Sequence, residues 1–165
     1  MITLKHILVA TDFSEPSGAA LRYGRALADT FRATLHVVHV VAQASSLVYG
    51  AGTYAFPILE LQQEVEDAAR KQLAELLIDG DPHPVETRSA LLTSNAPAVA
   101  IVDYAGRERI DLIVTGTNGR GGMAHLLMGS VAERVVRTAP CPVLTVRHPE
   151  HEFVTADALV AVAKA

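Results

Sequence analysis

Five short apolar segments alternate with stretches of helical periodicity, and this alternation constrains the fold more than any other feature of the sequence. The apolar segments are rich in β-branched residues and too short to be typical helices, which favours strands. They cover residues 6–10, 34–41, 85–92, 111–116 and 142–147. Parallel strands need long crossovers, and the helical stretches provide them. We therefore predict a doubly wound, Rossmann-like α/β domain with a five-stranded parallel sheet.

Capping residues and prolines mark where the helices begin and end. A Ser or Asn side chain can accept hydrogen bonds from the first free amides of a helix, and proline fits the first turn. Glycine followed by proline ends a helix. The first predicted helix is capped by Ser14 and has Pro16 in its first turn, and the second runs from Ile58 and stops at Gly80 and Pro82. The third is capped by Ser94 or Asn95 and has Pro97 in its first turn. The fourth covers residues 130–139.

The length of 165 residues, half of them apolar, suits one well-packed domain. We place this domain at residues 1–148. The remaining residues 149–165 form a tail whose apolar end has no obvious place in the sheet, although it could be helical. Such a tail could pack on a neighbouring subunit or simply fray.

Several classes of protein are disfavoured by composition. No apolar run approaches the roughly 20 residues that span a bilayer, and the N-terminus does not resemble a secretion signal, so we expect a cytoplasmic protein without a membrane span. The formal net charge is −4 and the basic residues are scattered, which argues against a nucleic-acid partner. The single cysteine, Cys141, cannot form an internal disulfide and suits a reducing compartment.

The most unusual segment is residues 116–130, GTNGRGGMAHLLMGS, which follows the fourth strand. Ligands of doubly wound sheets bind beyond the carboxyl ends of the strands, where the winding reverses. With strand order 3-2-1-4-5, this segment and the ATD sequence at residues 10–12 border the same crevice. Gly129 and Ser130 open the next helix with free amides, an arrangement that binds phosphate. The glycines of this segment could instead serve only a tight turn.

Two other phosphate motifs do not fit this segment. A Walker A loop ends in Gly-Lys-Ser/Thr, and here Met128 precedes Gly129 and Ser130 without a lysine. The stretch GRGGMA has the spacing of a dinucleotide fingerprint but lacks an acidic residue about twenty positions on. The carboxylate of Asp12 could accept hydrogen bonds from ribose hydroxyls, or merely cap the first helix. Arg120 could contact phosphate or remain solvated.

These residues resemble the universal stress protein family, in its ATP-binding branch. The signature of that family is glycine, two residues, glycine, nine residues, glycine, then serine or threonine. Gly116, Gly119, Gly129 and Ser130 match this spacing without a gap. The sequences ILVATDFSEPS, LHVV and GSVAERVVRTAPCPVLTVR extend the resemblance over residues 3–147.

The resemblance implies a nucleotide site and an assembly. The ligand would be ATP, ADP or AMP with Mg²⁺, and the usual pairing is a homodimer in which the last strands meet, with higher oligomers possible. Ala10, Asn118 and Ala132 depart from residues common in the family. Implied contacts to ribose, adenine or phosphate fall on Thr11, Asp12, Val37, Gly116, Gly119, Gly129, Ser130 and Val131.

We therefore expect a stress-response regulator rather than an enzyme, whose nucleotide state an unknown client protein reads. The alternative is a slow Mg²⁺-dependent ATPase or phosphoryl-transfer protein. A third class is an interaction module that keeps the fold without binding nucleotide, against which the intact signature argues. His36 and His39 are three residues apart on a strand and face opposite sides, so we expect no metal site there.

Overall fold

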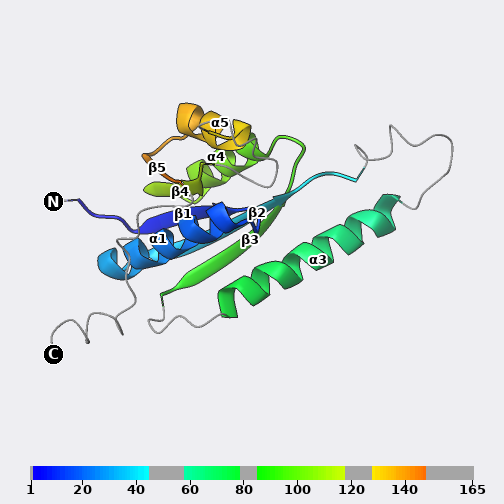
Figure 1. Cartoon of the computed structure of the whole chain (residues 1–165), viewed down its shortest axis with the longest axis horizontal. Coiled ribbons are helices and arrows are strands. Elements are labelled where there is room, and N and C mark those ends of the chain that lie inside the picture. The colour runs from blue at the N-terminus through cyan, green and yellow to red at the C-terminus, as the bar shows by residue number, and fades with distance from the viewer. Residues whose placement is uncertain (1, 45–57, 79–84, 118–127, 148–165) are drawn as a thin grey trace.

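A computed structural model describes residues 2–44, 58–78, 85–117 and 128–147 (Figure 1). The predicted tail, Gly80 and Pro82, and the segments 45–57 and 118–127 lie outside these residues. Helices and strands alternate along the chain as the sequence predicts. The elements are β1 (His6–Thr11), α1 (Glu15–Phe31), β2 (Thr34–Val41), α3 (Ile58–Ile78), β3 (Thr87–Thr93), α4 (Pro97–Arg107), β4 (Leu112–Gly116), α5 (Ser130–Thr138) and β5 (Val143–Val146).

The sheet confirms the predicted topology. All five strands are parallel and their order is β3-β2-β1-β4-β5. The chain winds outward from β1 to β3 and then crosses back, so that β4 lies on the other side of β1. The winding therefore reverses between β1 and β4, and a single α/β domain results.

Two layers of helices cover the sheet, with α1 and α3 on one face and α4 and α5 on the other (Figure 1). Alternate residues of each strand point into the two cores, because side chains alternate along a strand. Val9 and Val37 belong to the core under α1 and α3, whereas Leu8 and Val38 belong to the core under α4 and α5. The central strands are buried on both faces, which explains why they read as continuous apolar runs.

The start of α4 differs from the prediction. Neither Ser94 nor Asn95 is the N-cap residue; that position is Ala96, which makes no side-chain capping bond. The Asn95 side chain instead accepts the Gln43 amide at 3.0 Å, and the Ser94 hydroxyl accepts the Ala96 amide at 3.0 Å. These polar side chains stabilise the turn between β3 and α4 and its contact with the end of β2.

Candidate functional site

The carboxyl edge of the sheet brings the first loop next to the start of the glycine-rich segment. Ala10 of β1 pairs with Thr115 of β4, so Thr11 and Gly116 end their strands side by side. Asp12 leaves β1 beside the point where Thr117 leaves β4. The two loops thus begin at the same place, where the winding of the sheet reverses.

Hydrogen bonds hold the first loop in one shape. The Thr11 hydroxyl accepts the Phe13 amide at 3.1 Å and lies 3.1 Å from the Ser17 hydroxyl. One Asp12 carboxylate oxygen accepts both the amide and the hydroxyl of Ser14, in a turn that Asp side chains commonly form. Phe13 has a φ of 63°, in the left-handed region. This turn positions the carboxylate at the edge of the sheet and also supports the predicted cap, Ser14.

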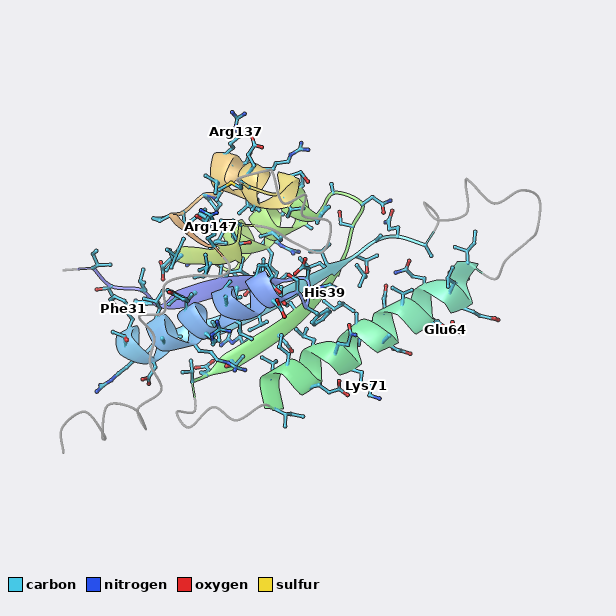
Figure 2. All side chains as sticks on the ribbon, in the orientation of Figure 1. Phe31, His39, Glu64, Lys71, Arg137 and Arg147 are labelled. Carbon is cyan, nitrogen blue, oxygen red and sulfur yellow. The ribbon has the colours of Figure 1, made fainter. Side chains whose placement is uncertain are left out.

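His39 also contributes to this loop, a role that the local sequence pattern does not predict. Its ring Nδ1 lies 2.8 Å from the carbonyl oxygen of Thr11, so this nitrogen carries the proton and donates. The ring packs on Phe13 with centroids 4.3 Å apart. Figure 2 shows His39 at the end of α1 opposite to Phe31, on the side of the site. His39 lies beside Thr11 because the two residues pair across β1 and β2. This pairing can be predicted only once the strand order and the register are known.

Gly116 is required by packing inside the protein. A Cβ atom at this position would lie 2.9 Å from the backbone oxygen of Pro16 in the first turn of α1. Real Cβ atoms do not approach backbone that closely, so a side chain would push α1 away from β4. The absence of a side chain at Gly116 therefore allows the first turn of α1 to approach the sheet. This packing role is additional to the predicted contact with phosphate.

Thr117 connects the end of β4 to the start of α5. Its amide donates to the Val146 carbonyl of β5 at 2.8 Å, and its carbonyl accepts the Gly129 amide at 2.6 Å. The Thr117 hydroxyl is buried and has no hydrogen-bond partner in the described part of the chain. A buried polar atom of this kind calls for an explanation, because leaving it unpaired costs about 1–3 kcal/mol.

The start of α5 differs from the prediction at Gly129, whose amide is not free but donates to the Thr117 carbonyl. Gly129 is the N-cap residue, in an extended conformation, and makes no side-chain capping bond, since glycine has none to offer. Ser130 and Val131 follow as the first exposed residues of the helix, and Ala132 is buried. Helix N-termini carry partial positive charge and free amides, so they favour anions. The start of α5 can therefore accept a phosphate.

Val37 lies apart from the other predicted site residues. It has no exposed surface and pairs with Val9, two residues before the level of Thr11. His39 and Val40 are the partly exposed residues of β2 nearest to the edge. Gly119 and Arg120 fall outside the described residues, so their predicted contacts remain predictions. The structure brings together Thr11, Asp12, Gly116, Gly129, Ser130 and Val131.

Two other polar regions lie away from this edge. His36 is fully buried near the opposite end of the sheet, with Nδ1 2.9 Å from the Tyr104 hydroxyl and Nε2 3.3 Å from Nδ1 of His6. A groove between the end of β3 and α4 is lined by Leu92, Val99, Asp103 and neighbouring residues, and contains none of the predicted site residues. Within the described ranges, no group of three or more His, Cys, Asp or Glu side chains could hold a metal ion.

The fold and its edge define a doubly wound α/β protein in which an aspartate loop and a helix start without a side-chain cap border the same edge of the sheet. The sequence model of the Universal stress protein family matches residues 3–147. Two similar proteins are "Universal stress protein A homolog 1" of Coxiella burnetii, 38% identical over 86% of this chain and 95% of that protein, and "Universal stress protein MJ0531" of Methanocaldococcus jannaschii, 34% identical over 90% and 85%. The chain belongs to the universal stress protein family.

Solved structures agree with the fold. Universal stress protein UspA from Lactobacillus plantarum superposes with a TM-score of 0.67 at 26% identity, covering 89% of this chain and all of that one. A universal stress protein from Archaeoglobus fulgidus, solved in complex with dAMP, superposes with a TM-score of 0.55 at 22% identity, covering 88% and 99%. Among the described residues, no helix is both long enough and apolar enough to cross a bilayer.

Proposed function

We propose that this chain is a regulatory protein that binds an adenine nucleotide between the Asp12 loop and the start of α5. One observation carries the proposal: Asp12 and the uncapped start of α5 border the same edge, linked through Thr117. The Asp12 carboxylate would accept ribose hydroxyls, and the amides of Ser130 and Val131 would donate to phosphate. The dAMP complex of the neighbour from Archaeoglobus fulgidus supports this ligand class.

The energetics require several contacts together. One negative charge at a helix N-terminus gains only about 0.3–1 kcal/mol, whereas micromolar affinity needs about 8 kcal/mol. Hydrogen bonds to charged groups contribute about 1.5–3 kcal/mol each, so four or five of them could offset the entropy lost on binding. The start of α5 and Asp12 provide part of that number. We propose that Gly119 and Arg120 provide further contacts.

We propose ATP, ADP or AMP as the ligand, with Mg²⁺ held mainly by the phosphates. No group of three or more metal-binding side chains occurs in the described ranges, and Asp12 is the carboxylate that we place at this edge. A phosphoryl-transfer enzyme positions its metal and its attacking group with several fixed residues. Any hydrolysis would therefore be slow, and the nucleotide would act as a signal that a client protein reads.

The same proposal includes a homodimer through β5 and a cytoplasmic location. β5 is an edge strand, and β4 is its only partner among the described strands. An edge strand exposes backbone groups that a second copy can cover. Two copies paired through Val143–Val146 would extend the sheet across the dimer and allow higher oligomers to form.

Calorimetric titration with ATP and Mg²⁺ tests the nucleotide site. The wild-type protein should bind with micromolar affinity, and Asp12→Asn should weaken binding about tenfold or more, since a charged acceptor is lost. Asn keeps an oxygen for the Ser14 amide, so the loop should stay folded. Asp29→Asn, an exposed residue near the end of α1, is the matched control and should bind as wild type does. The absence of binding heat for the wild type, and of nucleotide released on denaturation, would overturn the proposal.

A further inference from the structure

The Thr117 hydroxyl is buried and has no hydrogen-bond partner in the part of the chain that the structure describes. Within the described residues, it is the only buried side-chain oxygen or nitrogen of a non-exposed residue that lacks one. The residue is 8% exposed. Its own backbone groups are both used, in bonds to Val146 and Gly129. The hydroxyl is therefore the one group of Thr117 still available to a ligand.

The position of this hydroxyl relates it to the start of α5. Side chains alternate along β4, and Ile113 belongs to the core under α4 and α5 together with Val135 of α5. Thr115 shares this face. Thr117 directly follows β4, and its amide still bonds to the Val146 carbonyl of β5, so we infer that the alternation continues to Thr117. The bond between the Thr117 carbonyl and the Gly129 amide then holds the hydroxyl beside the first turn of α5.

We propose that the Thr117 hydroxyl donates a hydrogen bond to a phosphate oxygen of the nucleotide bound at the start of α5. This inference rests on the proposed function and adds a specific positioning residue to it. A phosphate oxygen is the acceptor that this place favours, because the free amides and the helix dipole attract an anion there. The oxygen is buried and has no partner in the described part of the chain, so a phosphate oxygen would be its first acceptor there.

The Thr117 hydroxyl should therefore lower the stability of the empty protein and raise the stability of the protein with bound nucleotide. In the empty protein the unpaired hydroxyl is a cost, because it loses its hydrogen bonds to water. In the loaded protein the same hydroxyl makes a charge-assisted bond. A structural hydroxyl with a partner in the protein would instead stabilise both states.

Thr117→Val and Thr117→Ser separate these roles. Valine keeps the shape and removes the hydroxyl, so the dissociation constant for ATP should rise about tenfold or more, while the empty protein melts at the same or a higher temperature. Serine keeps the hydroxyl and should bind ATP within about threefold of wild type. Adenosine lacks phosphate, so its affinity should be equal for the wild type and Thr117→Val.

Three results would overturn the inference: wild-type ATP affinity in Thr117→Val, an equal loss of ATP and adenosine affinity, or a lower melting temperature of empty Thr117→Val. In each of these three results the wild type still binds ATP. The proposed function would then be kept, and the role of Thr117 would be rejected. A wild type that binds no ATP overturns the proposed function itself, which the calorimetric titration detects before any variant is made.

Discussion

At the scale of single residues, Gly116 and Thr117 show how neighbouring positions can serve packing and binding. The glycine signature of the family includes Gly116, but its contact with Pro16 is a reason internal to the fold for the absence of a side chain. Thr117 is one of the two residues between Gly116 and Gly119 whose identity the signature leaves open, and yet it carries the unpaired hydroxyl. A glycine in a binding motif can thus be required before any ligand is present.

Gly116→Ala should destabilise the empty protein by about 1–3 kcal/mol, because the new methyl group overlaps the Pro16 backbone and forces α1 outward. Gly18→Ala is the matched control, since a Cβ at Gly18 meets nothing within 4 Å. Alanine should stabilise α1 there by about 0.4–1 kcal/mol. Urea unfolding without nucleotide measures both changes. Equal stability of Gly116→Ala and wild type would show that Gly116 is not held by packing.

His36 is the second residue with a measurable consequence. Burial, followed by the nearby His6 and Arg88, lowers its pKa below the ordinary value, whereas Glu108 and Glu86 oppose this shift. A neutral His36 can accept the Tyr104 hydroxyl at Nδ1 and donate from Nε2 to His6. Burial also raises the pKa of Tyr104, which keeps its proton available for this bond.

A histidine with a lowered folded-state pKa destabilises the fold in acid. In the unfolded chain His36 takes up a proton near pH 6.5, whereas in the folded chain it does so only at lower pH. The folded protein therefore loses stability as the pH falls below about 6.5, by at most about 1.4 kcal/mol per pH unit. His36→Gln should therefore lose less stability than the wild type between pH 7 and pH 5 in urea unfolding. Tyr104→Phe should be less stable than the wild type at pH 7, because it removes the hydroxyl that neutral His36 accepts. An unchanged slope in His36→Gln would contradict this assignment.

At the scale of elements, α3 is attached more weakly than its length suggests. Only Ala69 and Leu73 of this helix are buried, although it spans 21 residues (Figure 1). Polar contacts add to this attachment: Glu66 accepts the Thr93 hydroxyl at 2.9 Å, and Gln62 accepts the Ala44 amide at 2.6 Å. Bonds at exposed positions contribute little, so the buried leucine should dominate.

Leu73→Ala should lower the free energy of unfolding by about 2–4 kcal/mol, because it leaves a cavity between α3 and the sheet. Leu59→Ala, at a position 80% exposed on the same helix, should change stability by less than about 0.5 kcal/mol. Denaturant titration of both variants provides the comparison. Similar losses in the two variants would mean that α3 is not held through its buried residues.

At the scale of the whole molecule, the sequence predicts the fold almost completely and the site only in part. Strand and helix positions follow from apolar runs and caps, because the central runs must be buried on both faces. The strand order rests on the usual winding of doubly wound sheets. The α4 cap differs because Asn95 bonds to Gln43, 52 residues away, which local pattern cannot show. The place of His39 beside Thr11 depends on register across strands, and the Pro16 contact of Gly116 depends on packing between distant segments. Val37 is buried, as expected for a core residue of its strand.

We propose that nucleotide occupies the carboxyl edge of the sheet between β1 and the start of α5. Amide hydrogen exchange of the wild-type protein, with and without ATP and Mg²⁺, would locate the bound nucleotide. The amides of residues 12–17 and 129–132 should exchange more slowly with nucleotide, whereas those of residues 87–89, at the other end of the sheet, should not change. ATP binding that leaves residues 12–17 and 129–132 unprotected, or that protects the opposite end instead, would contradict the account.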